Sequence, residues 1–178
     1  SSGFGPLKDI LLNLDILPHA CQLVVVTGSN RPLLAWMLKH RFRHRVVPLG
    51  FSEQIPELME IATLLISKPG GLTTSEALAK RLPLVIINPI PGQEAYNARY
   101  LLSQGAAVQA SGPDTVRQTV RDLLDNPERL EMLRQRCGQL ARPAAALDIA
   151  KLLCDLADGN GSHSSGVSHE LLGRAYEG

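Results

Sequence analysis

The stretch SKPGGLTTSEALAKRLPLVIINPIPGQEAYNARYLLSQGAA, residues 67–107, decides the fold class of this chain. It holds two loops rich in glycine and proline, KPGG at 68–71 and PIPG at 89–92. Each loop follows a short apolar run, which predicts a buried strand, and each leads into a segment whose polar residues suit a first helical turn. The stretch therefore predicts two strand–loop–helix units in succession.

The same alternation extends over most of the 178 residues. We expect strands at 22–28, 45–50, 63–67, 83–88 and 106–110. We expect helices at 7–17, 30–43, 53–61, 72–81, 93–104, 114–124, 127–140 and 143–156. Continuous apolar strands that alternate with helices are typical of a parallel sheet covered on both faces. The expected fold class is α/β, a Rossmann-like doubly wound parallel sheet.

The domain organisation follows from the two ends of the chain. Residues 1–157 are expected to form one domain, and residues 158–178, which are rich in Gly, Ser and His, are expected to form a flexible tail. The opening segment SSGFGP, residues 1–6, is typical of a loop between a strand and a helix. Because the first strand of a doubly wound sheet is central, we expect that strand to lie upstream of this numbering, in a larger protein.

Composition narrows the class of partner. The net charge of +1 and the aromatic content of 4% argue against a nucleic-acid surface. The three cysteines have no metal-binding spacing and indicate reduced thiols in a cytosolic compartment. No apolar run approaches the ~18 residues that span a bilayer. We therefore expect a cytoplasmic protein, and peripheral contact with an anionic membrane is the one form of membrane association that stays open.

One segment, residues 31–45, concentrates positive charge. Its five cations are accompanied by no acidic residue, and they are Arg31, Lys39, Arg41, Arg43 and Arg45. One interpretation is contact with anionic lipid. The other, which we favour from the sequence, is a solvated helix end whose late cations suit the helix dipole.

The KPGG loop has the chemistry of a phosphate site. Two glycines let the chain approach a ligand closely, and the following helix offers free N–H groups and the positive end of its dipole. Thr73 adds a hydroxyl, and Glu76 lies one turn further on, where a carboxylate can accept from the two hydroxyls of a ribose. Alternatively, Thr73 and Glu76 form a capping box that only satisfies the start of the helix.

Two further segments carry candidate ligand contacts. Gln93 and Glu94 follow the PIPG loop, and an amide beside a carboxylate can recognise sugar hydroxyls, although polar residues in a first turn also simply favour the helix dipole. Gly3 and Gly5 give a weak dinucleotide-type fingerprint, because the third glycine is replaced by Lys8. A plain tight turn explains these two glycines equally well.

The motifs KPGGLTTSEAL, PLVIINPIPGQEAYNA and GAA together resemble the C-terminal, donor-binding domain of the lipid-directed glycosyltransferases. The resemblance is above all to the diacylglycerol glucosyltransferases and monogalactosyldiacylglycerol synthases. It is weaker to the N-acetylglucosaminyltransferase of peptidoglycan lipid intermediates. It implies one half of a two-domain B-type glycosyltransferase that takes UDP-glucose or UDP-galactose as donor and moves the hexose to a lipid such as diacylglycerol.

The resemblance also implies roles for individual residues. The segment 70–73 would meet the diphosphate and Glu76 the ribose, while Phe51 and Ser52 would hold the uracil and Gln93 and Glu94 the sugar. The complete implied donor site is Gly3, Gly5, Phe51, Ser52, Lys68, Gly70, Gly71, Leu72, Thr73, Glu76, Gln93, Glu94 and Asn97.

Catalytic residues are not expected in this chain, since the family's acceptor site and proposed base lie in an N-terminal domain. The resemblance implies an inverting transfer without metal or cofactor, with the UDP-sugar and that acceptor domain as partners. Two alternatives stay open. One is a stand-alone, non-catalytic nucleotide-sugar-binding subunit that needs a separate acceptor-binding partner. The other is an epimerase or a different soluble transferase with the same fold, against which the PGQE motif argues.

Overall fold

The computed structural model describes residues 7–157 of the chain. These residues fall into two compact units, one that ends at Ala141 and one that begins at Arg142. The first unit contains the strands and helices α1 to α7, and the second contributes α8 (Ala145–Ala157). The division lies inside the expected domain 1–157, and the expected tail lies outside the described residues.

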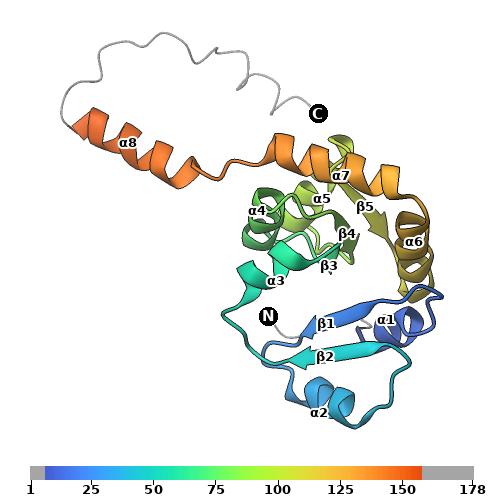
Figure 1. Ribbon diagram of the computed structural model, residues 1–178. Coiled ribbons are helices and arrows are strands. Elements are labelled where there is room, and N and C mark those ends of the chain that lie inside the picture. Colours follow the sequence, from blue (N-terminus) through green and yellow to red (C-terminus); the bar gives the residue numbers. More distant parts are fainter. Residues whose placement is uncertain (1–6, 158–178) are drawn as a thin grey trace. The chain divides into compact units, whose positions relative to one another are not determined.

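The expected alternation of strands and helices is confirmed, with small differences in bounds (Figure 1). In the first unit the strands are β1 (Gln22–Val26), β2 (Arg45–Leu49), β3 (Leu65–Ser67), β4 (Leu84–Ile87) and β5 (Ala107–Ala110). Its helices are α1 (Leu7–Leu14), α2 (Arg31–Lys39), α3 (Ile55–Ile61), α4 (Gly71–Ala79), α5 (Gln93–Ser103), α6 (Pro113–Asp125) and α7 (Pro127–Leu140).

All strand pairs are parallel, as expected, but the described strands form two sheets. One sheet pairs β1 with β2, and the other has the order β3-β4-β5. No hydrogen-bonded ladder joins β1 to β3 within residues 7–157. In a doubly wound sheet the first strand lies between these two positions. A strand upstream of this numbering that fills the interval stays a prediction.

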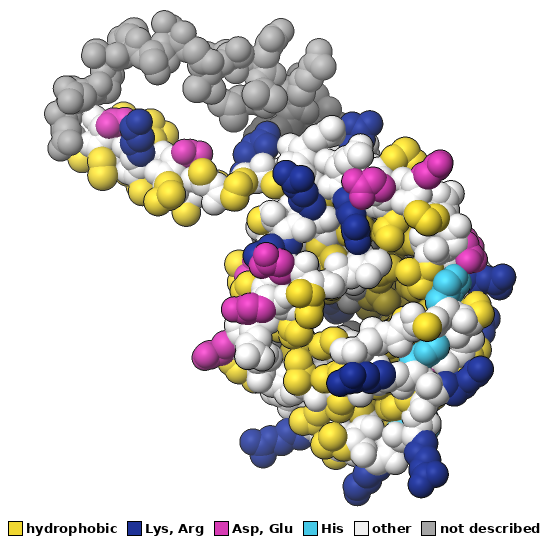
Figure 2. All heavy atoms as spheres, viewed as in Figure 1, with side chains coloured by type: hydrophobic (Ala, Val, Ile, Leu, Met, Phe, Trp, Pro, Cys, Tyr) yellow, Lys and Arg dark blue, Asp and Glu magenta, His cyan; other side chains and the backbone are white. Residues whose placement is uncertain are grey.

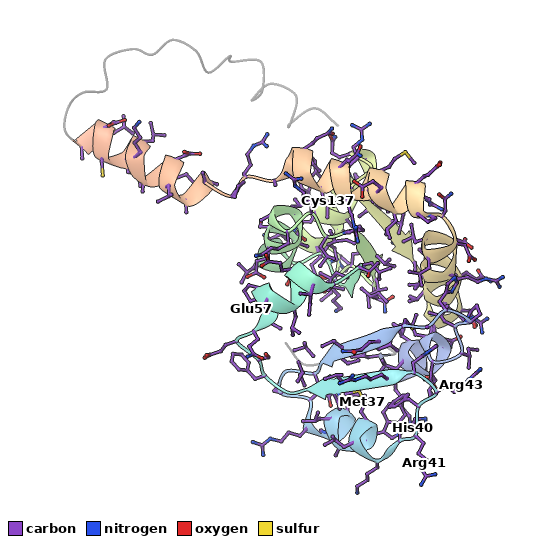
Figure 3. The ribbon with its side chains drawn as sticks, viewed as in Figure 1. Met37, His40, Arg41, Arg43, Glu57 and Cys137 are labelled. Carbon is purple, nitrogen blue, oxygen red and sulfur yellow. The ribbon has the colours of Figure 1, made fainter. Side chains whose placement is uncertain are left out.

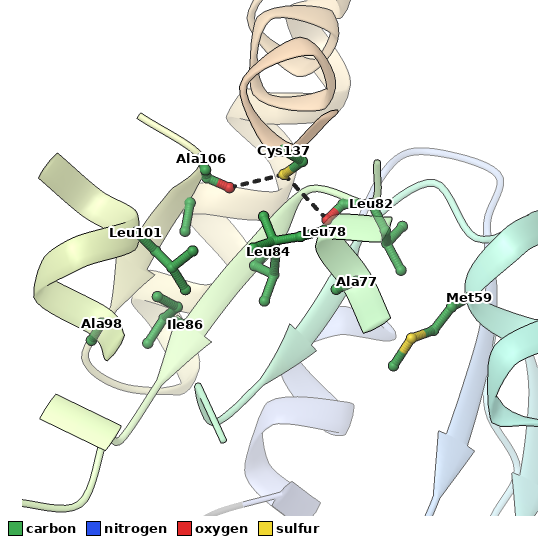
Figure 4. Close-up of a cluster of buried hydrophobic side chains, with 11 residues drawn as sticks. Met59, Ala77, Leu78, Leu82, Leu84, Ile86, Ala98, Leu101, Ala106 and Cys137 are labelled. Atoms are coloured by element: carbon green, nitrogen blue, oxygen red, sulfur yellow. Dashed lines mark hydrogen bonds between the residues drawn. The ribbon is translucent and has the colours of Figure 1, made fainter. Parts of the chain in front are cut away.

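Strand β4 is the centre of the larger sheet and is buried on both faces. On one face Leu84 and Ile86 pack with α4, α5 and α7, and on the other Val85 packs with α1 and α6. Figure 4 shows the first of these clusters. All three side chains are at most 1% exposed, so each contributes about 1.5–3 kcal/mol of hydrophobic stabilisation. The continuous apolar run that predicted a strand is explained by this burial.

Helix α2 ends at Lys39, so the expected range 30–43 was too long. Asn30 caps its start by accepting from the Leu33 N–H at 3.1 Å. At its end His40 adopts an extended backbone, with ψ of 141°, and the chain turns back toward β2. The buried carboxylate of Asp15 accepts from the backbone N–H of Arg43 at 2.8 Å, which holds this turn in place.

Helix α8 of the second unit is exposed along its whole described length. No helix between residues 7 and 157 combines the length and the apolar character that crossing a membrane requires.

The cysteines should differ sharply in reactivity. Cys137 is fully buried, its Sγ donates to the carbonyl of Ala106 at 3.2 Å (Figure 4), and burial raises its pKa to about 11. Near pH 8 only about one Cys137 in a thousand is a thiolate, the reactive form. Cys154 is exposed. Alkylation followed by mass spectrometry should modify Cys154 first and Cys137 only after denaturation. Equal labelling of both in the folded chain would contradict this packing.

Candidate functional site

The two glycine–proline loops emerge side by side from one edge of the larger sheet. Strands β3 and β4 are parallel neighbours, with Ser67 in register with Ile86. Their carboxyl ends therefore lie at the same edge, and the loops before α4 and α5 both begin there (Figure 1). This is the position at which open α/β sheets bind ligands.

The first loop ends in a helix start that is free to bind an anion. Helix α4 begins at Gly71, after Gly70 as its N-cap, and no side chain caps it. The first intrahelical bond runs from the Thr74 N–H to the Gly70 carbonyl at 2.9 Å. The N–H groups of Gly71, Leu72 and Thr73 have no hydrogen-bond partner in the described part of the chain. These donors and the dipole favour a negative charge at this point.

The capping-box interpretation of Thr73 and Glu76 is wrong. Thr73 is the third residue inside α4 and therefore does not occupy the N-cap position. The side-chain carboxylate of the half-buried Glu76 makes no hydrogen bond and no ion pair with residues 7–157. Its carboxylate is available to a ligand, and its role toward a ribose stays a prediction.

The second loop has an unusual backbone conformation and is bonded to its own helix. Asn88 and Gly92 have positive φ values of 40° and 101°. At Gly92 the ψ of −132° completes a conformation that only glycine adopts readily. The Glu94 Oε2 accepts from the Ile90 N–H at 2.9 Å. One oxygen of this carboxylate therefore fixes the loop, and Oε1 is left for other contacts.

Two side chains of α5 connect the loops. The Asn97 amide donates to the Pro69 carbonyl at 2.9 Å, which ties the second helix to the first loop. The amide nitrogen of Gln93 lies 3.6 Å from the position that a Cβ would take at Gly71. The structure thus brings Gln93 to the open start of α4, as a shared ligand site requires, and gives Asn97 a positioning role.

For the remaining predicted donor-site residues, no side-chain hydrogen bond or ion pair within residues 7–157 ties them to the shared site between the two loops. Phe51, 85% exposed, and Ser52 follow β2 in the other sheet, and no hydrogen bond joins them to the two loops. The Ser52 Oγ accepts from the Gln54 N–H at 3.2 Å. Lys68 is half-buried in the first loop without an ion pair among the described residues. Gly3 and Gly5 lie outside the described residues.

One polar group at this edge was not predicted. The Thr74 Oγ1 is buried in α4 with no hydrogen-bond partner in residues 7–157. A buried hydroxyl without a partner is uncommon and is normally satisfied by water. The run Thr73-Thr74-Ser75 does not reveal in the sequence which hydroxyl turns inward, because that depends on where the helix begins.

A match to known proteins identifies the family. The model of the family described as glycosyl transferases group 1 matches residues 7–142. The chain belongs to this family. The expected resemblance and the B-type glycosyltransferase fold class are confirmed.

Several individual relatives carry the same description, processive diacylglycerol beta-glucosyltransferase, and two of them illustrate the similarity. That of Bacillus cytotoxicus is 32% identical over 153 residues, 85% of this chain and 39% of the relative. That of Staphylococcus saprophyticus is 33% identical over 167 residues, 93% of this chain and 41% of the relative. The chain therefore spans about two fifths of the length of these relatives.

A solved structure supports the fold of this chain independently. The crystal structure of Acinetobacter baumannii MurG matches with a TM-score of 0.71 at 21% identity. The match covers 85% of this chain and 47% of MurG.

The Gly92→Ala substitution should destabilise the fold. A Cβ at a φ of 101° is strained even though no atom lies within 4 Å of it, and such strain costs about 1–3 kcal/mol. Gly112→Ala is the matched control, because Gly112 is extended and its Cβ position is equally open. Urea unfolding should show the loss for Gly92→Ala only. Equal stability of the two variants would contradict the loop conformation.

Proposed function

We propose that the chain is the donor-binding half of a glycosyltransferase that moves a hexose from a UDP-sugar to a lipid acceptor such as diacylglycerol. The family, the described activity of the two relatives and the share of their length that the chain spans support this proposal. The acceptor site and the catalytic base would lie in the part of a full-length enzyme that this chain does not include.

The open start of α4 carries the proposal. Three N–H groups, at Gly71, Leu72 and Thr73, have no hydrogen-bond partner within residues 7–157, and Gly70 beside them leaves space, since nothing lies within 4 Å of its Cβ position. A diphosphate placed there accepts hydrogen bonds from these donors and is stabilised by the dipole of α4. The Lys68 side chain in the same loop supplies a positive charge.

The sugar and the ribose would occupy the two flanks of this diphosphate. The Glu76 carboxylate, one turn along α4 and without a partner in the described part of the chain, would accept from the ribose hydroxyls. Gln93 lies beside Gly71, so its amide would donate to or accept from the hexose. Glu94 would offer Oε1, while its Oε2 keeps the loop in place.

The chemistry of transfer follows from this arrangement. A hydroxyl oxygen of the acceptor would form a bond to the anomeric carbon while the bond from that carbon to UDP breaks, which inverts the configuration. The acceptor's proton would pass to a base outside this chain. The N–H groups at the start of α4 would stabilise the negative charge that develops on the departing UDP, the role that a metal has in other transferases.

The Gly70→Ala variant separates a ligand role from a structural role. Gly70 has an ordinary φ of −64° and open space around its Cβ position, so the melting temperature should not change. A methyl group there would obstruct the approach of a diphosphate, and we expect UDP affinity to fall at least about tenfold. Calorimetric titration with UDP measures this, with Gly112→Ala as a control that should bind like the parent. Undiminished affinity in Gly70→Ala would contradict the proposed phosphate position.

Glu76 tests the ribose contact. Glu76→Ala removes charge-assisted hydrogen bonds worth ~1.5–3 kcal/mol each, which corresponds to a loss of about tenfold or more in UDP affinity. Glu76→Gln keeps the shape but weakens the pairing with two hydroxyls, so it should fall between the parent and Glu76→Ala. Titrations with UDP, UDP-glucose and UDP-galactose also identify the donor sugar. Unchanged affinity of both folded variants would overturn the assignment of Glu76.

A further inference from the structure

The charges of this chain are segregated, although its net charge is only +1. Residues 7–52 carry six Lys and Arg and two Asp, whereas residues 53–178 carry twelve Lys and Arg and fifteen Asp and Glu. The first part is thus at +4 and the second at −3. No acidic residue occurs between Ile16 and Ser52. Positive charge is therefore concentrated on the sheet β1–β2 and its helices.

The six cations all lie exposed around α2. They are Lys8, Arg31, Lys39, Arg41, Arg43 and Arg45, and we call them the α2 basic surface. None of them forms an ion pair with a described residue. Figure 2 shows Lys and Arg side chains over α2 and the segment after it, with no Asp or Glu among them on this face.

The two acidic residues of this part do not neutralise the α2 basic surface. Asp15 is 6% exposed, and its carboxylate is occupied by backbone N–H groups, two bonds from Arg43 and one from His44 at 2.8–2.9 Å. Asp9 is exposed on α1 beside Lys8 and makes no ion pair with the described residues. The other five cations, from Arg31 to Arg45, are therefore exposed in a segment of the chain that contains no surface carboxylate.

Helix α2 exposes a stripe of cationic and apolar side chains. Its inward side buries Met37 against β1 and α1. Its outward side exposes Arg31, Ala35, Leu38 and Lys39, which are spaced three or four residues apart and share one face. Leu38 is 69% exposed in the middle of the cations. A helix with an apolar side chain amid Lys and Arg suits the interface of an anionic bilayer.

A hollow opens at the end of this stripe. Its lining combines apolar and cationic groups, namely Met37, Leu38, His40, Phe42, His44, Arg45, Val46 and Pro48. Figure 3 shows His40, Arg41 and Arg43 projecting at this end of the unit. The aromatic rings here are occupied, since His40 stacks on Trp36 at 4.8 Å and Phe42 meets His40 edge-on at 4.6 Å. They offer no free platform on which nucleic-acid bases could stack.

We propose that the α2 basic surface binds an anionic phospholipid membrane. The choice of lipid over another polyanion rests on the proposed function, because a lipid acceptor is delivered in a membrane. The surface extends from Arg31, which follows the carboxyl end of β1, to Arg45, which begins β2. A membrane bound to this surface would therefore run alongside β1 and β2, and the carboxyl ends of both strands would lie at the edge of the contact.

Vesicle sedimentation of the full 178-residue chain tests the proposal. The chain should sediment with phosphatidylcholine vesicles that contain phosphatidylglycerol and remain in solution with phosphatidylcholine alone. Each basic residue near the surface contributes about fivefold to partitioning. The triple variant Lys39→Gln, Arg41→Gln, Arg43→Gln should therefore lose on the order of a hundredfold. High salt, which shortens the screening length to about 3 Å at 1 M, should release the parent chain.

A second triple variant controls for net charge. Arg121→Gln, Arg129→Gln, Arg136→Gln removes the same charge from exposed arginines of α6 and α7, and it should bind anionic vesicles within a few-fold of the parent. Circular dichroism should show that both triple variants are folded. Equal losses in the two variants, sedimentation with neutral vesicles, or tighter binding to duplex DNA than to anionic vesicles would each overturn the proposal.

UDP titration of the same samples separates this proposal from the proposed function. The α2 triple variant should bind UDP like the parent, since none of its three positions lies at the start of α4. Vesicle binding without UDP binding would contradict the proposed function and leave the membrane surface supported. UDP binding without vesicle binding would contradict the membrane surface alone.

Discussion

The parallel pairing of β3 with β4 is the constraint on which the candidate site depends. Because Ser67 lies in register with Ile86, the KPGG and PIPG loops leave the sheet at the same edge. The Asn97–Pro69 hydrogen bond then fixes α5 against the first loop. Burial of β4 on both faces makes this geometry costly to deform. The open N–H groups of α4 and the amide of Gln93 come together as a consequence.

The strands, the helices and the position of both loops could be predicted because the apolar runs are continuous and end at glycine and proline. The start of α4 could not. Thr73 and Glu76 satisfy the capping-box pattern, yet Gly70 is the N-cap of α4, and the Glu76 carboxylate has no partner among residues 7–157. Hydrogen bonds across the sequence, such as that from Asn97 to Pro69, depend on packing that no local pattern encodes. That the Ile90 N–H engages one Glu94 oxygen is likewise visible only in the folded loop.

The net charge and the linear order of the elements conceal two further properties of the chain. A net charge of +1 gives no sign of the α2 basic surface, because an acidic excess after Ser52 offsets most of its charge. Folding then gathers those cations around one helix, while Asp15 turns inward to bind the backbone. Likewise, the alternation of elements predicted one sheet, and only the pairing of strands shows that the described residues form two. Both properties depend on how the chain is arranged in space, which neither a total charge nor the order of elements along the sequence reveals.

Amide chemical shifts measured during titration with UDP test the central claim most directly, because the claim concerns particular N–H groups. In ¹⁵N-labelled chain, the backbone amides of Gly71, Leu72 and Thr73 should shift most and should saturate together with the side-chain amide of Gln93. That result would place the diphosphate at the open start of α4. Saturable shifts confined to the carboxyl ends of β1 and β2, with the α4 amides unmoved, would contradict the account.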